Sequence, residues 1–206
     1  MTPANLSSSW AYRRELAANL RRFTALAVVS FIGGLLGAYV LTLTGNAAFR
    51  RLVPWLLLFA TVLFWASPWI VQAARTLARH EADHPHAGMV AAGLGIQFVT
   101  SAYGGFFGAG MGIIMLAALA ITEGGDDYHV INAAKHLCGT LIQISAVVLF
   151  VVAGLVSWPE TVVVGAASVL GGYAGVVFGR RIPPRLMRWL VIGVGAALTV
   201  YFFVRG

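Results

Sequence analysis

The chain has 206 residues, of which 59% are hydrophobic and 10% charged, and its mean hydropathy is +0.84. This composition excludes an ordinary soluble domain and predicts an integral membrane protein whose main partner is the lipid bilayer. The net charge of +7 comes from basic residues scattered between apolar runs, so it does not indicate a nucleic-acid surface.

Six apolar stretches follow a basic N-terminal segment, residues 1–22, and each is long enough to cross a bilayer as a helix. About 20 helical residues cross the hydrocarbon core, and none of the stretches shows the alternation of a barrel strand. We therefore predict an all-α integral membrane fold with six transmembrane helices. They lie at residues 23–45, 52–74, 89–122, 137–157, 161–179 and 186–204.

The third stretch, residues 89–122, has an unusual length. Its 34 residues would reach ~51 Å as one helix, whereas two full spans need ~40 residues. Residues 103–112 contain five glycines, which are costly inside a regular helix. We predict one span that is broken in this glycine-rich segment.

An internal repeat appears when the chain is shifted against itself by 138 residues. The first two stretches then align with the last two. Four steps along the list of spans separate the two copies, and this even number predicts a parallel repeat of two four-helix halves. The first half lacks two spans, and we expect about fifty further residues in a complete first half. The aligned positions are Ser30 with Ser168, Gly33, Gly34 and Gly37 with Gly171, Gly172 and Gly175, Arg50 with Arg188, and Phe64 with Phe202.

The repeat divides the chain into a remnant of the first half at residues 23–79, a linker at 80–88 and the second half at 89–206. The double glycines at 33–34 and 171–172 are typical of close helix approach. With six spans, seven Lys and Arg residues fall on each side of the membrane, so this count predicts no orientation.

The glycine-rich break is the strongest candidate for a solute site. Irregular backbone at membrane depth must be buried in protein or face a water-filled cavity. A half-helix beginning near Gly108 would direct free N–H groups at the break, which suits an anion. The alternative is close helix packing through small residues. The candidate residues in the segment are Tyr103, Gly104, Gly105, Gly108, Gly110 and Gly112.

Three polar residues elsewhere are also candidates for the solute pathway. Lys135 lies close to the apolar core, where a cation is a functional-site hypothesis, and Asn132 lies three residues before it. Lys135 could instead extend to the headgroups. Gln97 could line a pathway or form an interhelical hydrogen bond.

The sequence gives no indication of catalysis, of a cofactor or of a metal site. No nucleophile is placed with a base, and no HExxH or P-loop motif is present. His80, His84 and His86 lie close together in the linker, but their spacing matches no established metal site. Cys138, the single cysteine, is expected to serve in packing.

The motifs together resemble the TauE/SafE family of sulfite exporters, multi-span permeases linked to sulfite and organosulfur anions. Family members carry two related halves, and the first opens with its own glycine-rich segment, which is absent here. The resemblance implies that residues 103–112, Asn132 and Lys135 are pathway positions. It is carried by residues 12–16, 33–38, 49–55, 103–110, 132–135, 171–175 and 181–185.

We therefore expect a non-enzymatic secondary transporter of a small anion such as sulfite or a sulfonate, driven by the membrane potential or a proton gradient. The expected location is the bacterial inner membrane, and a homo-oligomer is possible. A channel-like facilitator would share every feature. A non-transporting membrane subunit or transporter fragment is the alternative from another class.

Overall fold

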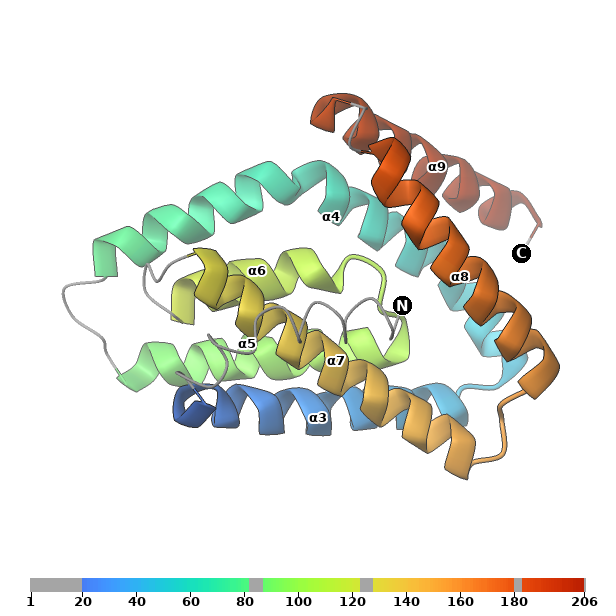
Figure 1. Cartoon of the computed structure of the whole chain (residues 1–206), viewed down its shortest axis with the longest axis horizontal. Helices are drawn as coiled ribbons and strands as arrows, with labels where there is room; N and C mark the ends of the chain where they lie inside the picture. The colour runs from blue at the N-terminus through green and yellow to red at the C-terminus, as the bar shows by residue number, and fades with distance from the viewer. Residues whose placement is uncertain (1–19, 82–86, 123–127, 180–182, 206) are drawn as a thin grey trace.

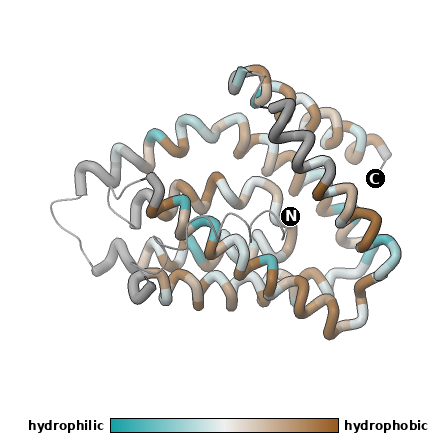
Figure 2. The backbone as a smooth tube through the Cα atoms, viewed as in Figure 1, coloured by the Kyte–Doolittle hydropathy of each residue, from teal (hydrophilic) through white to brown (hydrophobic). Residues whose placement is uncertain are grey.

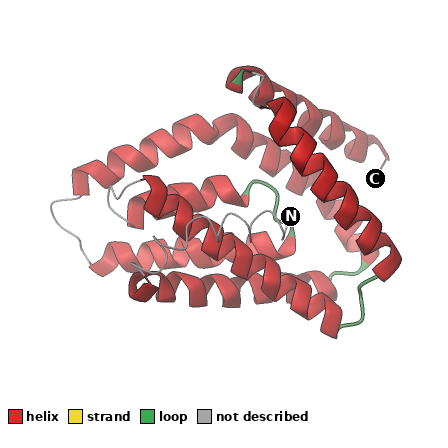
Figure 3. Ribbon diagram, viewed as in Figure 1, coloured by secondary structure: helices red, strands yellow, loops and turns green. Residues whose placement is uncertain are grey.

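The computed structural model describes residues 20–81, 87–122, 128–179 and 183–205, and every regular element in these ranges is a helix (Figure 3). Hydrophobic residues predominate along most of these helices (Figure 2). The all-α prediction is confirmed for the described residues. The helices are α3 (Leu20–Leu43), α4 (Asn46–Glu81), α5 (Ala87–Phe106), α6 (Met111–Thr122), α7 (Tyr128–Val152), α8 (Trp158–Gly179) and α9 (Pro184–Arg205).

Four described helices are long and apolar enough to cross a membrane, and the chain is therefore a multi-pass membrane protein. The predicted number of six spans is not reached by this criterion. The four segments are Phe23–Leu43 in α3, Asn46–Ala74 in α4, Val130–Val152 in α7 and Leu186–Val204 in α9.

The chain reverses direction between α5 and α6, which lie side by side (Figure 1). The Sδ atom of Met111 at the start of α6 lies 2.5 Å from where a Cβ on Gly104 would stand. About one helical turn farther from the break, Thr100 of α5 and Ile114 of α6 line the same cavity. The two helices therefore form a hairpin.

The hairpin confirms a break in the glycine-rich segment, but the prediction of one broken span over residues 89–122 is wrong. The 12 residues of α6 extend only ~18 Å, which is too short to cross the ~30 Å core. The glycines allow the backbone to turn back instead of continuing to the far side. Both ends of the hairpin consequently lie on one side of the bundle.

Glycines bring α3 into close contact with α5 and α7. A Cβ on Gly33 would stand 2.8 Å from the carbonyl oxygen of Phe98, and one on Gly34 would stand 2.6 Å from the Ser145 hydroxyl. A Cβ on Gly37 would collide with the carbonyl oxygen of Ala102. The predicted close approach at the first double glycine is confirmed, and small residues permit it as they do in other membrane bundles.

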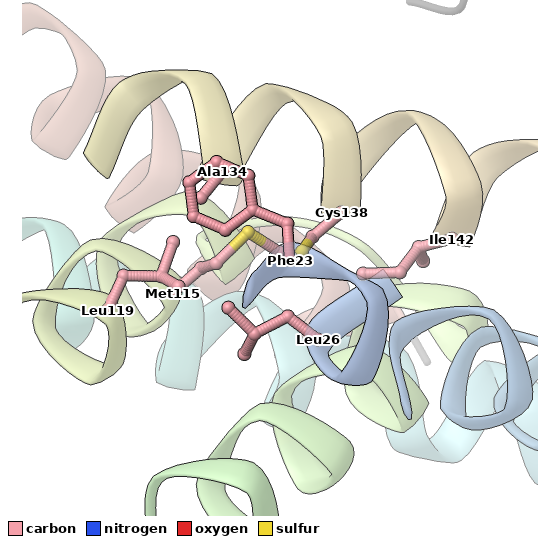
Figure 4. Close-up of a cluster of buried hydrophobic side chains, with 7 residues drawn as sticks. All are labelled: Phe23, Leu26, Met115, Leu119, Ala134, Cys138 and Ile142. Atoms are coloured by element: carbon pink, nitrogen blue, oxygen red, sulfur yellow. The ribbon is translucent and has the colours of Figure 1, made fainter. Parts of the chain in front are cut away.

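The largest buried apolar cluster lies where α3, α6 and α7 meet (Figure 4). Cys138 is fully buried in it, as its predicted packing role requires. Side chains from three helices thereby fix the return arm of the hairpin against α3 and α7. The cluster consists of Phe23, Leu26, Met115, Leu119, Ala134, Cys138 and Ile142.

Helices α4 and α9 pack against each other in opposite directions. Trp55 near the start of α4 stacks edge to face on Phe203 near the end of α9, with ring centroids 5.2 Å apart. Trp65, further along α4, accepts a 2.5 Å hydrogen bond through its carbonyl oxygen from Arg188 in the first turns of α9. These are the helices that the 138-residue shift aligns, so the predicted parallel relation is wrong.

The parallel prediction failed because it counted residues 89–122 as one crossing. A hairpin crosses no net distance, so α8 and α9 come three steps after α3 and α4 in the order of crossing helices, and an odd number of steps reverses their direction. Figure 1 shows the same reversal for α3 and α8, which run in opposite senses along the bundle.

Helix α8 stands apart from the bundle. It packs extensively against none of the other described helices, and the side chains of residues 158–169 and 171 are exposed. No atom lies within 4 Å of a Cβ placed on Gly171. At Gly171, the close approach predicted for the second double glycine is not formed with any described residue.

Helix α4 continues through two prolines to Glu81. Pro68 has no N–H to offer the carbonyl of Phe64, and the Ser67 hydroxyl donates to that carbonyl at 2.9 Å instead. The N-terminal segment up to residue 19 and His84 and His86 of the linker lie outside the described residues. In the part of the chain that is described, no group of His, Cys, Asp and Glu could hold a metal ion.

The α3–α5 contact predicts a large difference between two glycines of α5. A Cβ on Gly105 would collide with the carbonyl oxygen of Gly34, whereas one on Gly95 meets open space. Gly105→Ala should destabilise the purified protein by about 1–3 kcal/mol through overpacking. Gly95→Ala should be neutral or slightly stabilising, because alanine favours helix. Thermal unfolding in detergent measures both, and equal midpoints would contradict the packing.

Candidate functional site

The turn of the hairpin, residues 107–110, depends on two glycines in left-handed conformation. Gly108 and Gly110 both have φ of 80°. A side chain in that region brings its Cβ against the carbonyl oxygen, whereas glycine adopts it freely. The two glycines therefore let four residues reverse the chain without strain.

The turn satisfies several of its own backbone groups. The N–H groups of Phe107 and Gly108 both donate to the carbonyl of Tyr103, at 2.9 and 3.2 Å. The Tyr103 hydroxyl donates at 2.6 Å to the carbonyl of Ala109 on the returning side. These bonds close the turn, which matters where water is scarce.

The N-terminus of α6 points at the turn, as predicted for an anion site, although the helix begins at Met111 rather than near Gly108. Its first turn has N–H groups without intrahelical partners, and they carry the positive end of the helix dipole. A side chain on Gly112, in this first turn, would meet open space.

The turn lies against the middle of α4. A Cβ on Gly110 would stand 3.7 Å from the Cα of Ala60, and the rings of Phe59 and Tyr103 meet edge to face at 5.5 Å. Ala60 is the midpoint of the apolar segment Asn46–Ala74. The turn therefore lies against the middle of this candidate span.

Gln97 lies two turns before the glycine-rich segment and is fully buried. Its Nε2 donates to the Ser30 hydroxyl of α3 at 2.8 Å, so Gln97 forms the interhelical hydrogen bond that was one of its two predicted roles. Its Oε1 has no partner among the described residues. It remains a candidate for a polar contact inside the bundle.

Asn132 and Lys135 lie on α7, nearer the base of the hairpin than its turn. Asn132 is buried, and Lys135 is partly buried inside the candidate span Val130–Val152. Lys135 precedes Gly139 by one helical turn, and a Cβ on Gly139 would stand 3.9 Å from the Cε of Met111. The backbone of Lys135 therefore lies about 6 Å along α7 from Gly139, the residue that faces the Met111 side chain.

An apolar cavity of about 540 Å³ lies between α4, α5 and α6. Phe59, Thr100, Tyr103 and Ile114 contribute to its wall. The hydroxyls of Thr100 and Tyr103 both donate to backbone carbonyls. The two hydroxyls in its wall are therefore already engaged, and Asn132 and Lys135 lie on α7, which does not line the cavity.

The structure thus brings together the candidates Tyr103, Gly104, Gly105, Gly108 and Gly110 around one turn. Gln97 lies earlier on α5, where it contacts Ser30 of α3. Asn132 and Lys135 lie on a different helix, α7.

Sequence reasoning missed the α4 residues that support the turn, because Phe59, Ala60 and Leu63 are apolar residues within an apolar helix. Ser30 carries a sequence signal only through its place in the repeat. Its position opposite Gln97 could not be inferred from that repeat.

The fold is that of a multi-pass membrane protein, and comparison with known proteins identifies it as a membrane transporter. Residues 1–202 match the sulfite exporter TauE/SafE family, and the chain belongs to that family. It is similar to a probable membrane transporter protein of Haemophilus influenzae, with 26% identity over 196 residues that cover 94% of this chain and 72% of the relative. No solved structure matches the chain.

The left-handed glycines predict a selective sensitivity of the turn. Gly108→Ala and Gly110→Ala should each destabilise the protein by ~1–2 kcal/mol, because both require a positive φ. Gly112→Ala should cost nothing, since its Cβ would meet open space in a regular helix. Thermal unfolding of the three variants tests this, and a loss at Gly112 as large as at Gly108 would argue against the turn.

Proposed function

We propose that this chain moves a small anion, sulfite or an organosulfur anion, across the bacterial inner membrane by secondary transport. The observation that carries the proposal is the glycine turn at the midpoint of α4, with a helix N-terminus directed at it and Lys135 nearby on α7. Positive helix ends that meet at mid-membrane bind anionic groups in other transporters. The membrane potential or a proton gradient would drive the movement.

An inverted repeat supports the location of this site. In the repeat numbering, Phe203, Gly195 and Arg188 of α9 correspond to positions 65, 57 and 50 of α4. They contact Trp55, Thr61 and Trp65, so the contacts are centred on positions between 57 and 60. Such self-complementary pairing is expected around a twofold axis, and the glycine turn lies beside it.

The hairpin also supports an orientation. With α5 and α6 counted as re-entrant and α8 as a crossing, the basic residues divide unequally between the two sides. One side has Arg50, Arg51 and Arg205. The side from which the hairpin enters has Arg21, Arg22, Arg75, Arg79, Lys135, Arg185 and Arg188.

Four further arginines, outside the described residues, precede α3 or α9 in the sequence and join the larger group. They are Arg13, Arg14, Arg180 and Arg181. The distribution is then eleven against three, which supports a cytoplasmic location for the entry side of the hairpin.

In this orientation, an anion reaches the turn from the cytoplasm past Asn132 and Lys135. Lys135 supplies a positive charge inside the apolar region, where few charges occur without a functional reason. Asn132 adds an amide that can donate a hydrogen bond. The N–H groups of Met111 and Gly112 then receive the anion at the turn, since that of Ile113 donates to the carbonyl of Gly110. This direction of entry suits an exporter.

Sulfite efflux from loaded proteoliposomes tests the proposal. Lys135→Ala should lower the rate at least about tenfold, because it removes a charge-assisted contact of roughly 1.5–3 kcal/mol. Gly108→Leu should abolish efflux by distorting the turn. Lys135→Arg should retain part of the rate, and Arg51→Ala, at the opposite side of the bundle, should retain all of it.

Unchanged efflux in both Lys135→Ala and Gly108→Leu would refute this pathway. Efflux that does not respond to an imposed membrane potential or proton gradient would favour a channel-like facilitator of the same solute.

A further inference from the structure

Three buried polar atoms of the described residues have no hydrogen-bond partner, namely Gln97 Oε1, Gln143 Oε1 and Arg188 Nε. Gln97 is held through its Nε2, which donates to Ser30. Arg188 is held through its Nη2, which donates to the carbonyl of Trp65. The Gln143 side chain, in contrast, forms no hydrogen bond with any described residue. A buried amide oxygen without a partner is costly, so its presence requires an explanation.

Gln143 shares one face of α7 with the proposed pathway residues Asn132 and Lys135. With 3.6 residues in each turn, Asn132, Gly139 and Gln143 lie within about 40° of one another around the helix. Lys135 lies within about 80° of Gln143 and about 12 Å before it along the helix axis. The polar face of α7 therefore continues past Lys135 toward the glycine turn.

Contacts between α7 and the hairpin place Gln143 close to the level of the glycine turn. A Cβ on Gly139 would stand 3.9 Å from the Cε of Met111, the first residue of α6. The Cγ2 of Ile142, the neighbour of Gln143, lies 3.3 Å from the Cβ position of Gly104 in α5. Gln143 is one helical turn beyond Gly139, and side chains tilt toward the N-terminus of their helix. The Gln143 side chain therefore starts back toward the level at which α6 begins.

The amide of Gln143 offers both a donor and an acceptor. Its Nε2 can donate to an oxyanion, whereas its Oε1 can only accept. An enclosed acceptor beside an anion is unfavourable unless the anion itself has a proton to donate. Sulfite near neutral pH is partly protonated to hydrogensulfite, whereas sulfate carries no proton. The unpartnered oxygen therefore favours the protonated anion.

We propose that Gln143 is a further solute-binding residue, and that its carbonyl oxygen selects an anion that still carries a proton, such as hydrogensulfite. This inference rests on the proposed function, because it adds a ligand to the same anion site. The amide N–H donates to one oxygen of the anion, and Oε1 accepts from its O–H. A site built to hydrogen-bond a substrate O–H rejects the analogue that lacks it, because the buried polar group is then left unpaired.

Thermal unfolding of the full chain in detergent, over a series of sodium sulfite concentrations, tests this role. An anion that binds the folded protein raises the midpoint with the logarithm of 1 + [sulfite]/Kd, so the series gives Kd. Gln143→Met keeps the length of the side chain but removes both amide groups. It should raise Kd at least about tenfold. Sodium sulfate should give only the rise of an excluded salt, equal in wild type and variant.

The same scans without sulfite distinguish a ligand from a structural residue. Gln143→Met should leave the midpoint unchanged or raise it, because no hydrogen bond within the protein is lost. Gln97→Met should lower the midpoint by about 2–4 °C, because it leaves the Ser30 hydroxyl without its partner. Gln72→Met, at an exposed position of α4, should change neither the midpoint nor Kd.

A loss of stability in Gln143→Met as large as in Gln97→Met would overturn the inference, as would equal binding of sulfate and sulfite. Wild-type protein that sulfite does not stabilise would overturn the proposed solute together with its ligand. Sulfite binding that Gln143→Met leaves unchanged would overturn only the role of Gln143. The two failures are therefore distinguishable.

Discussion

Backbone inside the hydrocarbon core must find its hydrogen-bond partners within the protein, and the turn between α5 and α6 is built around that constraint. Tyr103 contributes two sets of these hydrogen bonds. Its carbonyl accepts from the N–H groups of Phe107 and Gly108, and its hydroxyl donates to the carbonyl of Ala109. Gly108 and Gly110 supply the positive φ that the reversal needs. The close packing of α3 on α5 and α7 then holds the hairpin in place.

The reversal sets the direction in which every later helix of the chain runs. Because the hairpin returns to the side from which it enters, α7 begins where α5 began, and α8 and α9 run opposite to their sequence counterparts α3 and α4. The antiparallel contacts of α4 with α9 contradict a parallel relation of the aligned helices.

Sequence patterns predicted the helical membrane fold, the break, the tight α3 contact and the burial of Cys138, because hydropathy and glycine spacing are local properties. They could not distinguish a half-helix that continues from one that folds back. That choice depends on the φ of Gly108 and Gly110 and on the support of the turn by Phe59 and Ala60, residues without any local signal. The hydrogen bond between Gln97 and Ser30 likewise joins residues far apart in the sequence, so no local pattern predicts it.

The re-entrant hairpin is the central claim, and cysteine labelling of intact cells tests it most directly. Asn46, at the start of α4, and Leu155, in the loop after α7, are exposed residues at connections that six full crossings would place on opposite sides. In a Cys138→Ala background, single cysteines at both positions should react with a membrane-impermeant maleimide added outside, whereas Thr76→Cys at the far end of α4 should not. Labelling of only one of the first two positions would show that residues 89–122 cross the membrane.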